Sequence, residues 1–521
     1  LGYSRSPSID VLLADGKLKY EPNYQRIRQI GGTVQKTSDA TLYKLEWLAK
    51  DGQKDGNFRR GGYFSSVLGF EHTLYKLIGD LGDLGLLMEY SFDSRRSRST
   101  DSLQDDIFIA TKGERCHGNQ FIDQKLLDRV SLVISDKILE IDSSKIHIVG
   151  DSKIFIKELA IEFRRFLNAK FIGITGTNGK TSTKELLVKF LETQYNVSYS
   201  RGNYNSTISL PLSILEFDTE SDYCVLEIGA SKTGEIKDLC NISNLDYGLI
   251  TNISEAHLSG YNSFKDLINT KMDLYRHLVD RDGRYFFNKD DKNIKIDKNS
   301  NIDTVSFSYD SDYSNNLDYY ANMLDIDKGI ITVNSSLFKV PYKTEAFARN
   351  FLASYSIADS IGIDRENIQK VLNDFTLPEG RGDIFEIGGV KIINDTYNAN
   401  LDSMIKGISQ LSAMKKSNIK IAVIIADMLE LSDSSIEIHK KLGTYINNLD
   451  FIDGVYAIGY FMEHTIAAID SKIFKKKYYK TKNFFTNDFK KQVNDYDIIY
   501  LKGSRGMSLD TVIKDIFDNV V

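Results

Sequence analysis

The pattern of hydrophobic and polar positions predicts strand, loop and helix units over most of the chain after residue 90. The clearest unit is FIGITGTNGKTSTK at 171–184, where a short apolar run leads into a glycine-rich turn and then into ELLVKFLET, which has helical spacing. The runs YCVLEIGAS and LDYGLITNIS predict further buried strands. Residues 296–325, rich in Asp, Asn, Ser and Tyr, predict an irregular excursion or surface hairpins.

The same pattern divides the chain into four parts and predicts an α/β fold. Residues 381–521 alternate strands with helices, which predicts a parallel, doubly wound sheet, and their basic run KIFKKKYYK (472–480) indicates a solvated face. Residues 169–380 form the central part around the glycine-rich turn. The pattern in residues 89–168 predicts a small α/β domain. Residues 1–88 show no sustained periodicity, so they are an unassigned extension or an added small domain.

Composition and charge exclude some classes of function. The formal net charge of −6 argues against a general nucleic-acid binder. No apolar run approaches the roughly 20 residues that span a bilayer, and no signal segment opens the chain. We therefore expect a cytoplasmic protein without membrane insertion.

The turn T-G-x-N-G-K-T has the chemistry of a phosphate loop. Gly176 and Gly179 let backbone N–H groups approach a phosphate, Lys180 adds a positive charge, and the Thr181 hydroxyl can reach Mg²⁺. The strict phosphate-loop pattern has glycine where this chain has Ile174, so an ordinary glycine-rich turn is the alternative. The flanking strand and helix favour a nucleoside-triphosphate site.

Other candidates follow predicted strands, and each has a plainer alternative. Glu227 ends a strand and could hold Mg²⁺, or it could be an exposed strand-end carboxylate. His257 lies just past the next strand, where a structural histidine is the commoner case. Lys271, on the following helix, has the pattern of a solvated lysine. Arg95, in an arginine-rich stretch, could pair with phosphates or simply face water.

Six motifs occur in order and together resemble the Mur ligases of peptidoglycan synthesis, and within them most closely the MurF branch. They are TGTNGKT (175–181), EIGA…GEI (227–236), TNISEAHLSGYNSF (251–264), NDTYNANLDSM (394–404), ADMLEL (426–431) and KGSRG (502–506). The resemblance covers residues 90 to 521.

This resemblance implies a three-domain ligase: a UDP-sugar-binding domain (89–168), a central ATPase domain built on a parallel sheet with a phosphate loop, and a C-terminal Rossmann-like domain. It implies that the carboxylate of UDP-N-acetylmuramoyl-tripeptide takes the γ-phosphoryl group of ATP, and that the amine of D-alanyl-D-alanine then displaces phosphate. ATP and Mg²⁺ are the implied cofactors. We expect a monomer that does not bind nucleic acid.

The resemblance also assigns roles to individual residues. It implies a catalytic role for Lys180, Glu227, His257, Lys271 and Arg381. The implied metal site is Thr181, Glu227, His257 and Lys271, of which the lysine is often carbamylated in the family. Implied nucleotide contacts are Gly176, Thr177, Asn178, Gly179, Lys180, Thr181, Asn350, Arg381 and Asp395. Implied substrate contacts are Ser94, Arg95, Lys112 and Gly113 for the UDP group, Gly202, Asn203 and Asn205 for the muramyl peptide, and Tyr397 and Asn398.

Two alternatives remain open at this point. One is a related Mur-type or folate polyglutamate ligase with a different acceptor, and the other is a nucleotide-binding regulatory or scaffold protein. The chain departs from the family pattern at Ser206, Ser209, Ser231, Ala346 and Phe347. The combined motifs favour the ligase. The sequence does not define the third residue of the tripeptide, the carbamylation of Lys271 or the arrangement of the domains.

Overall fold

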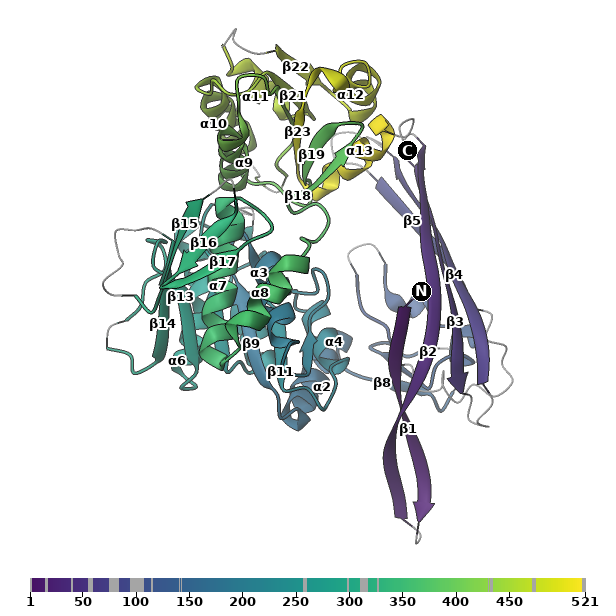
Figure 1. Cartoon of the computed structure of the whole chain (residues 1–521). Coiled ribbons are helices and arrows are strands. Elements are labelled where there is room, and N and C mark those ends of the chain that lie inside the picture. Colours follow the sequence, from purple (N-terminus) through teal and green to yellow (C-terminus); the bar gives the residue numbers. More distant parts are fainter. Residues whose placement is uncertain are drawn as a thin grey trace. The chain divides into compact units, whose positions relative to one another are not determined.

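A computed structural model of the chain provides the structure (Figure 1). It describes residues 2–14, 17–38, 41–54, 60–74, 84–93, 107–113, 116–139, 141, 143–255, 260–297, 299–309, 317–325, 328–429, 431, 434–470 and 475–517, and up to residue 93 it describes only the course of the strands. The chain divides into two compact units, Leu1–Phe155 and Ile156–Val521.

The first unit contains two sheets. One is antiparallel and follows chain order: β1 (Gly2–Ala14), β2 (Lys17–Ser38), β3 (Thr41–Lys54), β4 (Arg60–Leu74) and β5 (Leu84–Asp93). The sequence pattern did not indicate these strands. The other is parallel: β6 (Ile107–Ile109), β7 (Leu132–Ser135) and β8 (Ile146–Ile148), with the short helices η2 (Gly118–Phe121) and α1 (Gln124–Leu127) between β6 and β7. Helix α2 (Ser152–Phe166) crosses the division between the two units.

The second unit begins with a sheet of nine strands. Their order is β10 (Val197–Tyr199), β11 (Tyr223–Glu227), β9 (Lys170–Thr175), β12 (Tyr247–Ile250), β13 (Arg284–Asn288), β14 (Asp303–Ser308), β15 (Tyr319–Asp325), β16 (Ile330–Val333) and β17 (Ser336–Lys339). The strands from β10 to β15 are parallel, and β15, β16 and β17 pair antiparallel.

Helices cover both faces of this sheet because its central strands are apolar on both sides. Helices α3 (Lys180–Leu191), α7 (Glu345–Ile361) and α8 (Arg365–Asp374) share one core with the sheet. Helices α4 (Ser209–Leu215), α5 (Glu235–Ser243) and α6 (Phe264–Val279) share the other core. The parallel central sheet predicted from the sequence is confirmed.

The prediction of an irregular excursion is wrong for residues 303–308 and 319–325, because β14 and β15 extend the main sheet as parallel strands. Their polar composition concealed them. The backbone N–H and hydroxyl of Ser306 donate to the Asp318 carboxylate at 2.7 and 2.8 Å, so polar side chains here satisfy local hydrogen bonds. Phe307 and Ala321 are buried and provide the apolar contacts.

The C-terminal part contains a six-stranded sheet in the order β18 (Asp383–Ile387), β19 (Val390–Asp395), β23 (Ile498–Lys502), β20 (Ile421–Ala426), β21 (Gly454–Ile458) and β22 (Lys475–Tyr479). The hairpin β18–β19 is antiparallel, it turns at Gly388 and Gly389 as the sequence predicts, and the other pairs are parallel. The basic run forms edge strand β22, where Lys475 and Lys476 are exposed.

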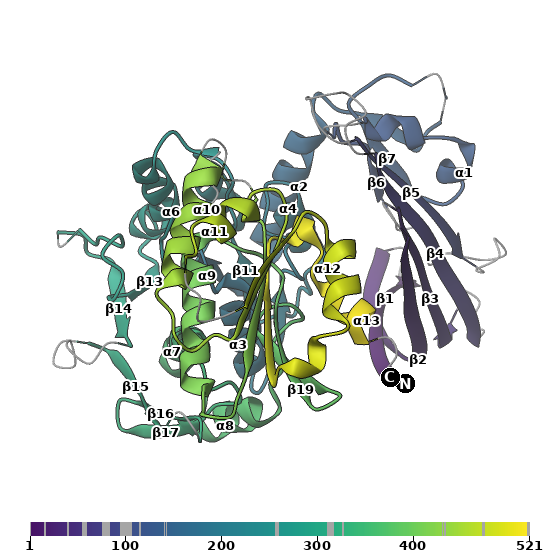
Figure 2. The ribbon, with the colours of Figure 1, turned by 90° about the horizontal axis from the view of Figure 1, so that it is seen from above.

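Figure 2 shows this sheet between two helical layers. Helices α9 (Leu401–Ser409), α10 (Ser435–Asn447) and α11 (Met462–Ala467) lie on one face, with η5 (Gln410–Met414). Helices α12 (Lys482–Phe489) and α13 (Asp510–Phe517) lie on the other, and η7 (Val493–Asp495) and η8 (Arg505–Met507) flank β23. The predicted doubly wound sheet is confirmed. Within the described residues, no helix is long and apolar enough to cross a membrane.

Candidate active site

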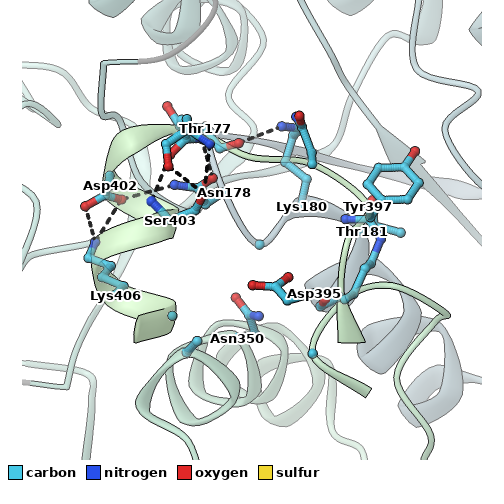
Figure 3. A pocket seen from close by; sticks show the side chains of 18 of the residues that line it. Thr177, Asn178, Lys180, Thr181, Asn350, Asp395, Tyr397, Asp402, Ser403 and Lys406 are labelled. Carbon is cyan, nitrogen blue, oxygen red and sulfur yellow. Dashed lines mark hydrogen bonds and ion pairs between the residues drawn. The ribbon is translucent and has the colours of Figure 1, made fainter. Parts of the chain in front are cut away.

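A cavity of about 470 Å³ lies within the second unit, and residues from both of its sheets line it. Figure 3 shows its labelled side chains. Fifteen of the predicted site residues line this cavity: Gly176, Thr177, Asn178, Gly179, Lys180, Thr181, Asn203, Asn205, Glu227, Lys271, Asn350, Arg381, Asp395, Tyr397 and Asn398.

The phosphate loop joins the carboxyl end of β9 to the start of α3. Gly176 has φ +146°, and a Cβ there would lie 1.9 Å from the Thr251 hydroxyl, so only glycine fits. Gly179, with φ +81°, is the N-cap of α3. Because the cap has no side chain, the backbone N–H groups of the helix start are open to an anion.

Lys180 lies over the loop that precedes it. Its Nζ donates to the carbonyls of Gly176 and Thr177 at 2.9 and 3.0 Å. Burial lowers the pKa of Lys180, Arg381 adds to this effect, and Glu227 opposes it. Among the described residues no carboxylate forms an ion pair with Lys180 or Arg381, so their charge is available to an anionic ligand.

Glu227 ends strand β11 and is 2% exposed. Its carboxylate accepts a hydrogen bond from the Thr181 hydroxyl and one of 2.7 Å from the Asn205 amide. Its backbone N–H donates to the Ser200 hydroxyl at 2.9 Å. The plainer alternative, an exposed strand-end carboxylate, is therefore wrong.

Lys271 is 5% exposed, so the solvated lysine that its helical pattern suggested is also wrong. It lies on the inner face of α6, and its Nζ donates to the Gly176 carbonyl at 3.0 Å. Burial, with the nearby Lys180 as a second cause, lowers the pKa of Lys271 to about 7. A lysine in this environment is partly neutral near neutral pH and can act as a nucleophile or be modified.

The C-terminal sheet contributes Asp395, at the end of β19. Its carboxylate accepts hydrogen bonds from the Tyr500 hydroxyl at 2.9 Å and from Lys502 Nζ at 2.7 Å, both on neighbouring strand β23. Lys502 is 3% exposed and also donates to the Asn398 carbonyl at 3.0 Å. These contacts hold Asp395 at the edge of the cavity, and Figure 3 shows it with Asn350, which comes from α7.

Arg381 lies between the two sheets of the unit. Its guanidinium carbon is 3.8 Å from the ring centroid of Tyr397, and that of Arg505 is 5.2 Å from the same ring. The flanking Gly380 and Gly382 have positive φ, so this connection follows a course that other residues would strain. The Tyr397 ring thus supports two cations by cation–π contact.

Several of the predicted site residues lie elsewhere. Gly202 is exposed and does not line the cavity. Lys112 and Gly113 belong to the first unit, where Lys112 bridges to His117 and the Gly113 N–H donates to the Cys116 carbonyl at 2.9 Å. Ser94, Arg95 and His257 lie outside the described residues.

Sequence reasoning left many lining residues unassigned, and five with polar side chains illustrate why: Asn252, Asp402, Lys406, Tyr500 and Lys502. Four of them lie in or beside motifs that the sequence analysis noted: Asn252 in TNISEAHLSGYNSF, Asp402 in NDTYNANLDSM, and Lys502 and Tyr500 at KGSRG. Lys406, one helical turn after Asp402, had no such signal. Only the pairing of β19 with β23 shows that Lys502 and Asp395 meet.

Two of the residues expected to bind a metal, Thr181 and Glu227, lie side by side in the cavity. In the described part of the chain no cluster of three or more His, Cys, Asp or Glu side chains could hold an ion alone. The adjacent Thr181 hydroxyl and Glu227 carboxylate are hard oxygen donors beside the phosphate loop. Such a pair fits Mg²⁺, which usually keeps water and takes one or two carboxylates together with substrate phosphates.

Comparison with known proteins gives consistent matches. The family model described as the Mur ligase middle domain matches residues 174–358, and that described as the Mur ligase, glutamate ligase domain matches residues 380–505. The UDP-N-acetylmuramoyl-tripeptide–D-alanyl-D-alanine ligase of Rickettsia prowazekii (strain Madrid E) is 31% identical over 422 residues, which are 80% of this chain and 93% of that protein. The enzyme of the same name from Bacillus subtilis (strain 168) is 30% identical, over 80% of this chain and 91% of that protein.

Solved structures agree with these matches. A crystal structure of MurF from Acinetobacter baumannii superimposes with a TM-score of 0.71 at 25% identity, covering 81% of this chain and 92% of that chain. MurF ligase from Thermotoga maritima in complex with ADP gives a TM-score of 0.69 at 27% identity, covering 80% and 95%.

Proposed function

Because this chain belongs to the Mur ligase family, we propose that it joins D-alanyl-D-alanine to UDP-N-acetylmuramoyl-tripeptide with ATP as the energy source. The observation that carries the proposal is the cavity in which the phosphate loop, the buried Glu227 carboxylate and the C-terminal Asp395 meet. A nucleotide-binding scaffold would not need Lys271 buried against the Gly176 carbonyl or Asp395 held by two neighbours.

The reaction has two steps. A carboxylate oxygen of the tripeptide attacks the γ-phosphorus of ATP, the bond from that phosphorus to the β–γ bridging oxygen breaks, and ADP leaves. The amine of D-alanyl-D-alanine then attacks the acyl carbon, its proton is lost, and phosphate leaves as the amide forms. Alignment and charge neutralisation dominate such chemistry.

Each part of the cavity has a role in these steps. Lys180 and the N–H groups at the start of α3 bind the phosphates, and Arg381 neutralises charge that develops on the transferred group. Asn350 reads the adenine base, and Asp395 binds the ribose. Mg²⁺, when bound, would neutralise phosphate charge, and Thr181 and Glu227 would hold it near Lys271. His257, the other residue that the family resemblance assigns to the metal, lies outside the described residues.

The other substrates extend from the cavity. Asn203 and Asn205 face the muramyl peptide, with Gly202 beyond the cavity, and Tyr397 and Asn398 contact the substrate from the C-terminal side. We propose that Lys112 and Gly113, together with Ser94 and Arg95, hold the UDP group. A cytoplasmic location and a monomeric state remain predictions from the sequence.

Phosphate release tests the proposal. Purified protein is mixed with ATP, Mg²⁺, D-alanyl-D-alanine and one of three UDP-muramyl-tripeptides that end in lysine, diaminopimelate or ornithine. We expect release only when the dipeptide and one of the tripeptides are both present. Release with another acyl substrate or amine instead would identify a related Mur-type or folate polyglutamate ligase. A folded protein that binds ATP but releases no phosphate with any of them would contradict the proposal.

A further inference from the structure

The side chain of Asn178 connects the phosphate loop to the first turn of helix α9. Its Nδ2 donates to the Asp402 carboxylate at 3.1 Å, and its Oδ1 accepts from the Asn400 amide at 2.9 Å. Figure 3 shows Asn178 and Asp402 facing each other. A carboxylate can only accept, so the donor and acceptor ends of Asn178 each meet a complementary group.

The two partners of Asn178, the side chains of Asn400 and Asp402, are held in place by other contacts within helix α9. Asn400 is the N-cap, and its side chain accepts from the Ser403 N–H at 2.9 Å while its own N–H donates to the Ser403 hydroxyl at 3.0 Å. Asp402 accepts from Lys406 Nζ, 3.1 Å away and one turn further along the helix. Contacts within the helix therefore orient both side chains, independently of Asn178.

The loop also holds Asn178 firmly, through its backbone. The Asn178 N–H donates to the Asn252 side chain at 3.1 Å, and its carbonyl accepts from the Thr251 hydroxyl at 2.7 Å. Gly179 and Lys180 follow directly, so a displacement of Asn178 moves the atoms that face a phosphate. None of these contacts is needed by the reaction steps described above.

We propose that Asn400 and Asp402 are positioning residues that act through Asn178 and hold the phosphate loop in the shape that binds nucleotide. The proposal rests on the proposed nucleotide site. Because coupling between two equilibria is reciprocal, nucleotide binding in turn favours docking of α9 on the loop. Two hydrogen bonds of ordinary net strength correspond to a roughly five- to thirtyfold change in nucleotide affinity.

The test measures the dissociation constant of ADP by titration calorimetry for the full chain and four variants. Asn400→Ser keeps a good N-cap but is too short to reach Asn178. Asp402→Ala and Asn178→Ala remove the other two groups, and Asn178→Ala/Asn400→Ser completes a double-mutant cycle. Asn178→Ala removes both hydrogen bonds and should weaken ADP binding roughly five- to thirtyfold, whereas Asn400→Ser and Asp402→Ala each remove one and should weaken it about two- to fivefold. The double variant should be little weaker than Asn178→Ala.

The controls separate positioning from general destabilisation. Asp123→Ser exchanges a different helix cap, that of α1, and should leave ADP affinity unchanged. The affinity of the Asn400→Ser variant for the UDP-muramyl-tripeptide should also be unchanged, whereas a misfolded chain would lose both ligands. If Asp402→Ala does not fold, Asn400→Ser decides the question alone.

Three results have distinct meanings. Wild-type protein that does not bind ADP would overturn the nucleotide site and this inference together. ADP binding that is equal in wild type and Asn400→Ser would overturn the inference and leave the proposed function intact. Effects that multiply in the double variant would also overturn it, because Asn178 and Asn400 would then act independently.

Discussion

Lys180 and Lys271 place two amines beside one peptide carbonyl, that of Gly176. Burial lowers the pKa of both lysines, and the nearby Lys180 lowers that of Lys271 further. A phosphate beside both amines would favour their charged forms. The cavity is therefore arranged for an anionic ligand at the level of single side chains.

Replacing Lys180 with alanine should reduce turnover by at least about a hundredfold, because a charge that stabilises the transferred phosphoryl group is lost. Binding of the UDP-muramyl-tripeptide should be spared, since Lys180 serves only the phosphates. Steady-state kinetics and a direct binding assay measure the two effects. Lys189→Ala, on the same helix but paired with Glu192 at the surface, is the matched control. Loss of UDP-substrate binding in a folded Lys180→Ala protein would contradict this division of roles.

His277 predicts a pH dependence of stability. Its Nε2 accepts the Leu245 N–H at 3.3 Å, and burial, helped by Arg281, lowers its pKa to about 4. The unfolded chain, with an ordinary value near 6.5, binds a proton between pH 6.5 and 4 that the folded chain does not, so stability falls as the pH drops through this range. The contribution is at most about 1.4 kcal/mol per pH unit.

His277→Gln can still accept the Leu245 hydrogen bond but cannot titrate. Urea unfolding at pH 7, 6 and 5 should show a shallower loss of stability for this variant than for the wild type. Other groups titrate equally in both proteins, so the difference isolates His277. Parallel curves for the two proteins would show that His277 does not contribute.

At the scale of single residues, the sequence correctly placed the glycine-rich loop between a strand and a helix, and Glu227 at a strand end, because glycine spacing and strand ends are local features. It failed for Lys271, whose helical pattern does not differ from that of a solvated lysine. Its burial depends on α6 packing beneath a loop almost a hundred residues earlier in the chain. Ser206 and Ser209, where the chain departs from the family pattern, hydrogen-bond to each other at the start of α4, with their hydroxyl oxygens 2.9 Å apart.

Helix α6 shows how one element positions a site residue. Its N-cap Ser263 accepts from the Asp266 N–H at 3.2 Å, and the buried face of the helix carries Lys271. Ser263→Ala should lower the free energy of unfolding by about 1 kcal/mol, as measured by chemical denaturation. Ser263→Thr keeps the hydroxyl and should lose much less. Equal losses in the two variants would assign the effect to packing instead of capping.

Elements with apolar, alternating or turn signals were predicted correctly, among them β9, β11, β20 and the β18–β19 hairpin. The missed elements are those in which polar residues make local contacts. Asp318 binds Ser306 across β14 and β15, and Lys477 of β22 pairs with Asp488 at 2.8 Å. Strand β22 lies at the edge of its sheet, where few apolar positions are needed, whereas β14 and β15 lie inside theirs and their polar composition alone suggested irregular structure.

For the whole molecule, every residue that lines the cavity belongs to the unit Ile156–Val521. ADP at a hundredfold excess over its dissociation constant should therefore stabilise this unit by about 2.7 kcal/mol. Scanning calorimetry should show its transition moving while that of Leu1–Phe155 stays in place. Lys180→Ala should reduce the shift. A joint shift of both transitions would show instead that the two units unfold together.

The motifs predicted the order of the domains along the chain. They did not predict that the nine-stranded and six-stranded sheets would line one cavity together. Nothing local in NDTYNANLDSM indicates that Asp402 contacts Asn178. We propose the predicted limits, 1–88, 89–168, 169–380 and 381–521, as the domains of the protein. The boundary between the two compact units of the structure falls elsewhere, between Phe155 and Ile156 within helix α2.

The cavity wall runs from Gly176 to Lys502 along the chain. During synthesis on a ribosome, the phosphate loop emerges early, whereas the lysine that holds Asp395 emerges more than three hundred residues later. A nascent chain therefore has a phosphate loop long before it has a complete nucleotide site. Until β23 joins the sheet between β19 and β20, the growing protein cannot hold Asp395 in place. It therefore has no complete cavity in which ATP could bind.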